Sequence, residues 1–227
     1  IDALTVRSGE IVGIAGISGN GQKELTEILA GQRPTDSGQV MVNGEAYGAT
    51  RDETRKNRVR FIPEEPLQNA CAPRMTVSEN LAFRTFDLKL DGKDAIWLNK
   101  GSMKKRASAL ISDFKVKTAS SSSPIAALSG GNVQRAVLAR ELTGEVDLLI
   151  VSNPCFGLDF SAVAEIRARI MKARNLGAAV LLLSEDLDEL LEMSDRIMVI
   201  SEGKLVYETP ARSADIGVIG AHMAGHH

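Results

Sequence analysis

The sequence predicts an α/β fold built on a mainly parallel sheet. Short apolar segments of the kind that are buried on both faces of a sheet lie at 11–15, 146–151 and 178–183. Segments with apolar residues at helical spacing lie between them, and a glycine-rich loop precedes the first of these helices. Apolar strands that alternate with helices are typical of a parallel sheet covered on both faces, and 227 residues with 44% hydrophobic content can form one large domain or two lobes.

The first part of the chain also predicts strands that flank this loop. Leu4 and Val6 alternate with polar neighbours and predict a strand whose upstream partner is absent, so we expect the chain to be a fragment of a longer protein. Asn43-Gly44 lies between short apolar segments and predicts a hairpin with an antiparallel pair of strands. A further strand is expected at 58–62, directly before a proline.

The middle of the chain predicts a helical lobe rather than further sheet. Helical periodicity is found at 77–83, 103–114 and 133–142. The serines at 120–123 predict a flexible loop, and Glu79 and Asn80 are expected on the surface.

The α/β alternation resumes near residue 146 and continues almost to the end. We expect strands at 146–151, 178–183, 196–200 and 204–207, and helices at 162–173 and 187–193. The three histidines, His222, His226 and His227, lie close to the C-terminus, so residues 222–227 are expected to be the remnant of a tag or a disordered tail.

Charge and composition narrow the classes of function. The 27 basic and 29 acidic residues give a net charge of −2, which favours neither nucleic acid nor an anionic membrane surface as a partner. No apolar segment is long enough to span a membrane, so a membrane role would be peripheral. Cys71 and Cys155 lack metal-ligand spacing and are expected to be packing residues in a reducing compartment.

The loop that follows the first strand predicts a phosphate site. Its glycines and the start of the next helix would direct several backbone N–H groups at one point, which is a ready anion site. The mononucleotide template Gly-x-x-x-x-Gly-Lys-Ser/Thr fits at Gly16 and Gly21, but Gln22 replaces the lysine and Lys23 replaces the hydroxyl residue. The expected nucleotide-binding residues are Gly16, Ser18, Gly19, Asn20, Gly21, Gln22, Lys23 and Glu24.

Two later motifs extend this pattern. Leu128-Ser-Gly-Gly-Asn132 precedes a helix, and an apolar strand from Leu148 then leads into a Pro/Gly turn that ends at Asp159. With the first loop, this order of motifs resembles the nucleotide-binding domain of ABC transporter ATPases over essentially the whole chain. The matching motifs are Walker A at 16–23, the Q-loop at Glu64, the signature at 128–132, Walker B at 148–153, the D-loop at Gly157, Leu158 and Asp159, and the H-loop at 184–186.

The resemblance is closer to one subfamily. Gly19-Asn-Gly-Gln-Lys-Glu-Leu25 and Leu183-Ser-Glu-Asp-Leu187 are similar to the C-terminal ATPase domain of tandem importers for simple sugars and nucleosides. The resemblance implies a P-loop NTPase core lobe with antiparallel β elements at 1–64 and 146–221. It implies a helical subdomain with the signature at 65–145.

This chain departs from an active ATPase at its own site. In the family, an aspartate at the end of Walker B holds Mg²⁺ and the next glutamate orients water, but Ser152 and Asn153 stand there. Glu185 replaces the switch histidine and Glu64 the Q-loop glutamine. Loss of a general base alone typically costs ~10²–10⁴-fold in rate. We therefore expect no competent catalytic residue, no metal ligand and no Mg²⁺ at this site, with ATP or ADP bound weakly or only with a partner.

The signature, in contrast, is intact at Leu128, Ser129, Gly130 and Gly131, and only Asn132 departs from the family pattern. In the family, each signature covers the nucleotide held by the partner domain. The resemblance therefore implies a second ATPase domain as partner, in the N-terminal half of the same polypeptide, together with membrane permease subunits at the cytoplasmic face of the cell membrane.

Two alternatives remain open. Lys23 is long enough to swing back and replace the missing lysine. The chain is also consistent with a non-catalytic nucleotide sensor or a structural docking and dimerisation module. A self-sufficient P-loop kinase or GTPase is disfavoured because it needs the missing lysine and metal ligand, and a DNA-linked ABC ATPase is disfavoured by the near-neutral charge.

Overall fold

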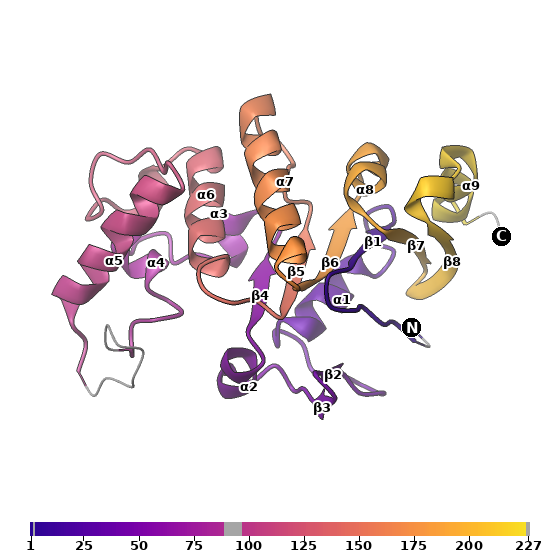
Figure 1. The fold of residues 1–227 in the computed structure, drawn as a ribbon, viewed down its shortest axis with the longest axis horizontal. Helices are drawn as coiled ribbons and strands as arrows, with labels where there is room; N and C mark the ends of the chain where they lie inside the picture. The colour runs from indigo at the N-terminus through magenta and orange to yellow at the C-terminus, as the bar shows by residue number, and fades with distance from the viewer. Residues whose placement is uncertain (2, 89–96, 226–227) are drawn as a thin grey trace. The chain divides into compact units, whose positions relative to one another are not determined.

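The computed structural model describes residues 1, 3–88 and 97–225 (Figure 1). The chain forms two compact units. The first consists of residues 1–63, 145–154 and 167–227, and the second of residues 64–144 and 155–166. Each unit is described by itself below.

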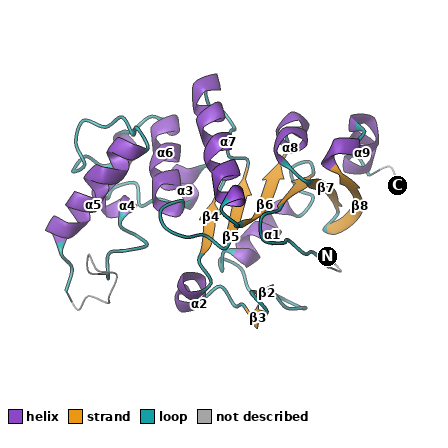
Figure 2. Cartoon of the chain, in the orientation of Figure 1, coloured by secondary structure: helices purple, strands orange, loops and turns teal. Residues whose placement is uncertain are grey.

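A six-stranded sheet organises the first unit (Figure 2). Its order is β4-β5-β6-β1-β7-β8, and only the last pair, β7 and β8, is antiparallel. The strands are β1 (Ile11–Ala15), β4 (Val59–Ile62), β5 (Leu148–Ser152), β6 (Ala179–Ser184), β7 (Arg196–Ser201) and β8 (Lys204–Pro210). Every residue of β1 is buried, as expected for an apolar strand between two parallel neighbours.

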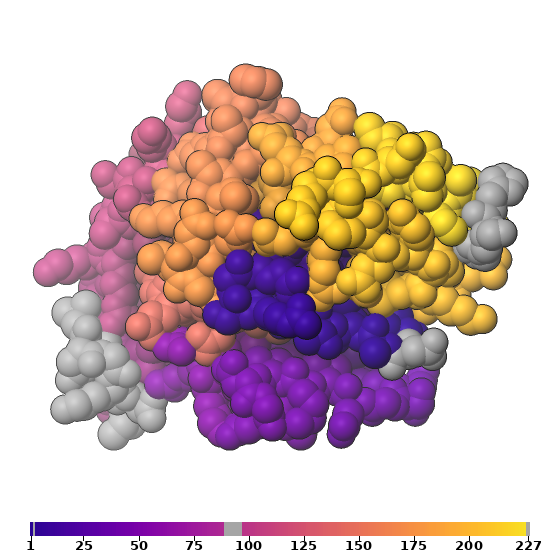
Figure 3. Space-filling model, turned by 45° about the vertical axis from the view of Figure 1, so that its right-hand side comes forward, coloured from indigo at the N-terminus to yellow at the C-terminus, as the bar shows by residue number. Residues whose placement is uncertain are grey.

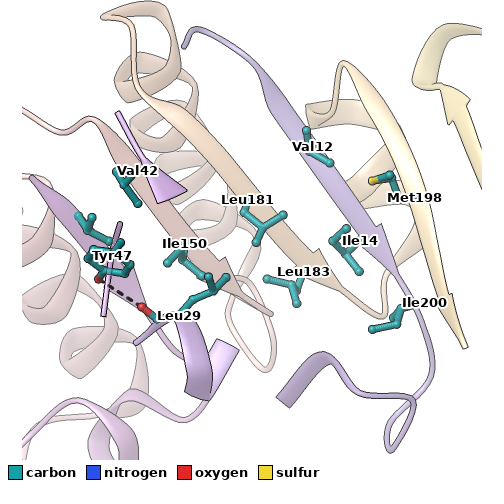
Figure 4. Close-up of a cluster of buried hydrophobic side chains, with 11 residues drawn as sticks. Val12, Ile14, Leu29, Val42, Tyr47, Ile150, Leu181, Leu183, Met198 and Ile200 are labelled. Atoms are coloured by element: carbon teal, nitrogen blue, oxygen red, sulfur yellow. Dashed lines mark hydrogen bonds between the residues drawn. The ribbon is translucent and has the colours of Figure 1, made fainter. Parts of the chain in front are cut away.

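One face of this sheet packs on α1 (Gln22–Leu29) and on a small hairpin. The core cluster on this face includes Val12, Ile14, Ile150, Leu181, Leu183, Met198 and Ile200 from the sheet, with Leu29, Val42 and Tyr47 opposite (Figure 4). The Tyr47 hydroxyl donates to the Leu29 carbonyl at 3.3 Å, which satisfies the polar atom of a buried ring. Burying a side chain of this size contributes about 1.5–3 kcal/mol.

The opposite face of β1 packs on α8 (Leu187–Met193) at very short range. A Cβ added to Gly13 would lie 3.0 Å from Leu190 Cδ2 and closer still to the Ser194 hydroxyl. Glycine therefore allows the helix to approach the central strand. The remaining helical elements of this unit are α1 (Gln22–Leu29), α2 (Arg51–Lys56), η2 (Ala211–Ser213), α9 (Ile216–Met223) and residues 167–175 of α7 (Phe160–Asn175).

The hairpin predicted at Asn43-Gly44 is confirmed. β2 (Met41–Val42) pairs with β3 (Glu45–Ala46) in the predicted antiparallel sense. The turn residues Asn43 and Gly44 have φ angles of 53° and 78°, a conformation that these two residue types adopt most readily.

The N-terminal segment differs from the expected strand. Residues around Leu4 and Val6 form no strand, and both side chains are partly buried against the core cluster, while the segment as a whole is visible on the surface beside the C-terminal elements (Figure 3). Ser8 Oγ donates to the Gly177 carbonyl at 2.6 Å, and the Ile11 amide donates to Asp195 Oδ2 at 2.8 Å. The segment is therefore attached by apolar packing and by single hydrogen bonds, including one from Arg196 of β7 to the Thr5 carbonyl, and not by a strand ladder.

The second unit is helical, as predicted for the middle of the chain. It contains α3 (Pro66–Asn69), α4 (Val77–Leu81), α5 (Lys100–Asp113), η1 (Ile125–Ala127), α6 (Gly130–Glu141) and the first residues of α7. Residues 155–166 also belong to it, although the sequence placed them with the core lobe.

The C-terminus also differs from the expected tail. Asp215 caps α9 by accepting a hydrogen bond from the Val218 amide at 3.1 Å, and the helix continues to Met223. The His222 ring stacks on Tyr207 of β8 at 4.6 Å. His222 and Met223 are thus part of the fold, whereas His226 and His227 lie outside the described residues.

Candidate nucleotide site

Three of the predicted site segments meet at the carboxyl edge of the sheet in the first unit. The loop 16–21 follows β1, Ser152 ends β5 and Ser184 ends β6. The strand register pairs Ala15 with Ser184, and Ser152 with Leu183. Because these strands are parallel neighbours, the loop and the two strand ends lie side by side (Figure 1).

The loop is held in place by the C-terminal elements. Gly21 has a φ angle of 110°, and a Cβ added there would lie 3.1 Å from Gly203 Cα. The Gly203 amide donates to the Asn20 carbonyl at 2.9 Å, and Asn20 Nδ2 donates to the Met223 carbonyl at 3.4 Å. The turn between β7 and β8 and the end of α9 therefore fix the outer side of the loop.

The Gln22 side chain folds back into the loop. Its Nε2 donates to the Ile17 carbonyl at 3.0 Å, and its Oε1 is buried without a hydrogen-bond partner among the described residues. A phosphate cradle presents donors and positive charge to its guest. Here Gln22 stands in the lysine position. Its amide is neutral, its Nε2 is already bonded to the loop, and the remaining polar atom, Oε1, can only accept hydrogen bonds.

Gly16 allows this arrangement. A Cβ at position 16 would lie 2.7 Å from Ile200 Cγ2 and closer still to the Gln22 amide. We expect Gly16→Ala to lower the free energy of unfolding by about 1–3 kcal/mol, measured by urea denaturation, because Ile200 is in the core and cannot yield. Gly130→Ala is the control: an added Cβ there meets nothing within 4 Å, so no loss is expected. An equal loss in both variants would contradict the packing argument.

Lys23 does not take over the lysine position in this conformation. Its ammonium lies 3.9 Å from Glu27 Oε1, one turn further along α1, and the side chain is 82% exposed. Glu24 occupies the first turn of the same helix, where a negative charge would oppose a bound phosphate. The alternative in which Lys23 swings back thus requires the side chain to leave Glu27.

Asn153 connects the two strand ends at the position of the water-orienting carboxylate. It has a φ angle of 42°, and its amide donates to the Leu183 carbonyl at 2.8 Å. Its Oδ1 accepts the Glu185 amide at 3.0 Å, while Ser184 Oγ donates to Glu189 Oε2 at 2.8 Å. The contacts of Asn153 join the segment that follows β5 to the end of β6. Among the residues that the structure describes, no three His, Cys, Asp or Glu side chains are grouped to hold a metal ion.

The predicted signature lies in the second unit, at the start of α6. Ser129 is the N-cap residue, and its Oγ accepts a hydrogen bond from Asn132 Nδ2 at 2.8 Å. Asn132 Oδ1 in turn accepts the Lys117 amide at 2.7 Å, so the side chain at this position links Ser129 to Lys117. Leu158 is the nearest residue to a Cβ added at Gly131, at 3.7 Å. Packing within this chain therefore does not require either glycine.

The D-loop residues lie in the same unit and lead into α7. Asp159 Oδ1 accepts hydrogen bonds from Ser161 Oγ at 2.8 Å and from the Ala162 amide at 3.0 Å. The bond from Ser161 has the largest effect, and together with the bond from the Ala162 amide it holds the pKa of the Asp159 carboxyl below its usual value. Gly157 has a φ angle of 69°, which suits a tight turn before the helix. Glu64 is the first residue of this unit, and its carbonyl accepts Asn69 Nδ2 at 2.7 Å.

Sequence reasoning missed one residue of this unit. Asn80, expected on the surface, is 2% exposed. The signal was present, because Thr76-x-x-Glu79 is a capping box and starts a helix whose buried face includes Val77, Asn80 and Leu81. The helical spacing of these three residues, i, i+3 and i+4, places the asparagine with the two apolar side chains.

Comparison with known proteins identifies the family. The family model described as ABC transporter matches residues 2–155. The chain belongs to this family.

Two relatives are similar over almost the whole chain. It is 42% identical over 225 residues to the glucose import ATP-binding protein TsgD13 of Haloferax volcanii, covering 98% of this chain and 41% of the relative. It is 37% identical to the guanosine import ATP-binding protein NupO of Bacillus subtilis, covering 98% of this chain and 44% of that relative. The chain thus spans less than half the length of these relatives.

Solved structures of ABC cassettes confirm the predicted fold class. The ATP-binding cassette MJ0796, in a dimeric post-hydrolysis state with ADP and Pi, superposes with a TM-score of 0.74 at 21% identity, covering 93% of this chain and 89% of the cassette. This similarity shows the P-loop NTPase fold. Over the described part of this ABC transporter chain, no helix is long and apolar enough to cross a membrane.

Proposed function

We propose that this chain is a nucleotide-binding domain of an importer for a sugar, a nucleoside or a similar small solute. Two of the relatives in the preceding section carry names that refer to glucose and guanosine import. The domain would act at the cytoplasmic face of the membrane with permease subunits, since those would contain the path for the solute.

We further propose that the site at the sheet edge does not hydrolyse ATP. The observation that carries this proposal is the Gln22 side chain, which bonds to Ile17 inside the loop where a lysine would meet the phosphates. Ser152 and Asn153 add neither a metal ligand nor a base, and phosphoryl transfer depends on such charge stabilisation and water positioning. ATP or ADP would bind here weakly or with the help of a partner, without Mg²⁺.

The positive role of the chain would then be to complete the nucleotide site of a second ATPase domain. Ser129 and the N–H groups of Gly130 and Gly131 open a helix of twelve residues, which favours a phosphate group held by another domain. Neither glycine is required by packing, and glycine at these positions permits close approach of a ligand to the backbone. We place the second domain in the N-terminal half of the same polypeptide.

The test is an ATPase assay of this chain alone and mixed with that second domain. We expect background turnover for the chain alone and a change in turnover on mixing. Gly130→Asp should lower the turnover of the mixture about tenfold or more, because it places a carboxylate beside the γ-phosphate. The folded state should persist in this variant, since acidic residues are favourable in the first turn of a helix.

Two outcomes would contradict the proposal. Robust turnover by the isolated chain that Gln22→Ala abolishes would show a competent site. A mixture whose turnover is unaffected by Gly130→Asp would favour a sensor or docking module instead.

A further inference from the structure

The segment that precedes the signature is paired with the loop before α4. The Ile125 amide donates to the Met75 carbonyl at 3.0 Å, and the Ala126 amide donates to the Pro73 carbonyl at 3.2 Å. The Val77 amide donates to the Ser123 carbonyl at 2.9 Å. Residues 72–80, which we call the support segment, therefore run alongside the residues that lead into Ser129.

Asn80 closes the support segment on itself. Its Oδ1 accepts the Ala72 amide at 2.8 Å, and its Nδ2 lies 3.0–3.2 Å from the carbonyls of Ala72, Met75 and Thr76. The side chain is buried and its polar atoms are all bonded. Because only residues 77–80 of the support segment are helical, this one side chain fixes most of its irregular part.

The far end of the signature helix is attached to the same segment. Arg140, 8% exposed, donates through Nη1 to the carbonyls of Ala70 at 2.8 Å and Asn80 at 3.3 Å. Its Nε donates to Glu141 Oε1 at 2.7 Å, and Arg84 Nη2 donates to Glu141 Oε2 at 2.7 Å. The support segment thus contacts both the approach to α6 and its last turn.

We propose that Asn80 is a positioning residue for the signature. By fixing the support segment, it determines the position of Ser129, Gly130 and Gly131 relative to a nucleotide. The effect on a second domain rests on the proposed function. The effect on the signature itself does not, and the two are tested separately.

The first experiment measures amide hydrogen exchange in the chain alone. Asn80→Ala removes four hydrogen-bond contacts, so the amides of Ile125, Ala126 and Val133 should exchange about tenfold faster. The Val133 amide donates to the Ser129 carbonyl and reports on the signature turn directly. Asn57→Ala is the matched control, because Asn57 is 4% exposed and donates to the Glu53 carbonyl in the first unit.

Exchange at Val133 that is unchanged in Asn80→Ala, or is equally raised in Asn57→Ala, would overturn the inference. If Asn80→Ala fails to fold, Arg140→Lys keeps a positive charge near Glu141 but replaces the planar guanidinium that bonds Glu141 and the carbonyls of Ala70 and Asn80 together. This variant loosens the support segment from α6, so it should accelerate exchange at the same amides by a smaller factor. No change would show that the support segment does not position the signature, and would overturn the inference.

The second experiment measures ATP turnover of the mixture with the second ATPase domain. Asn80→Ala should lower kcat about tenfold and leave KM for ATP within about twofold, because the partner's own loop holds the nucleotide. Asn57→Ala should change neither constant. If Gly130→Asp lowers kcat and Asn80→Ala does not, the inference is overturned. If neither variant changes kcat while the exchange result holds, the proposed function fails and the positioning role stands.

Discussion

Replacing Gln22 by lysine and Lys23 by threonine should raise the affinity of this chain for MgATP by about tenfold to hundredfold. The substitutions supply a cation for the β- and γ-phosphates and a hydroxyl for the metal, and a hydrogen bond to a charged group contributes about 1.5–3 kcal/mol. They also remove the bond from Gln22 to the Ile17 carbonyl. Calorimetric titration measures the change, with Lys23→Thr alone as the control that leaves Gln22 in place.

Hydrolysis should need two further changes, Ser152→Asp and Asn153→Glu. They add the metal ligand and the water-orienting carboxylate, and a positioned base is typically worth ~10²–10⁴-fold in rate. A glutamate at 153 retains an acceptor for the Glu185 amide, so the connection between β5 and β6 is preserved. The measurement is phosphate release by the quadruple variant, which carries all four substitutions, mixed with the second domain.

Two results would contradict the proposal that this site is degenerate. One is tight MgATP binding by the unaltered chain. The other is a correctly folded quadruple variant that binds MgATP no more tightly than the Lys23→Thr control.

Glu141→Gln should lower the free energy of unfolding by about 3–5 kcal/mol. Glu141 is 1% exposed and bonded to both Arg84 and Arg140, so removing its charge leaves two guanidinium groups without their anion in the second unit. Urea denaturation measures the loss. Glu145→Gln is the control: Glu145 pairs with Arg58 but is 80% exposed, and such surface pairs contribute about 0–1 kcal/mol.

The same carboxylate makes stability depend on pH. Burial would raise the pKa of Glu141, but the charges of Arg140 and Arg84 outweigh burial and hold the pKa below its usual value. A depressed pKa gives stability that is present above the pKa of the unfolded chain and is lost as the pH falls through that of the folded chain. The acid side of the stability curve should therefore flatten in Glu141→Gln. A curve of unchanged slope would show that other carboxylates dominate acid unfolding.

Local patterns predicted most of the fold. The helix at 187–193 was placed at its observed bounds, and Asn43-Gly44 predicted a hairpin, because both features are determined by neighbouring residues. The strand expected around Leu4 failed because a strand needs a partner, and none of the described strands pairs with this segment. α2 was missed although Thr50 and Glu53 form a capping box, since its six residues carry no apolar stripe.

The sequence predicts the chemistry of the site, whereas the geometry comes from the structure alone. The identities of Gln22, Ser152 and Asn153 alone indicate missing charges, so the sequence is sufficient for a prediction of degeneracy. The contacts they make instead, such as Asn153 with the Glu185 amide, join residues 32 positions apart and have no local signal. Asn80 had a local signal in its helical spacing, but its role arises from contacts with Ala72 and Arg140 that only the folded chain brings together.

The Gln22 side chain can also be viewed as an intramolecular ligand of its own loop. Its amide is tethered beside the Ile17 carbonyl, and a short tether corresponds to an effective concentration on the order of millimolar or more. A phosphate oxygen is an acceptor like the Ile17 carbonyl, so it gains this N–H donor only after the bond to Ile17 breaks. The loop therefore has a bonded arrangement without nucleotide, and a ligand that needs the Gln22 amide must first break its bond to the Ile17 carbonyl.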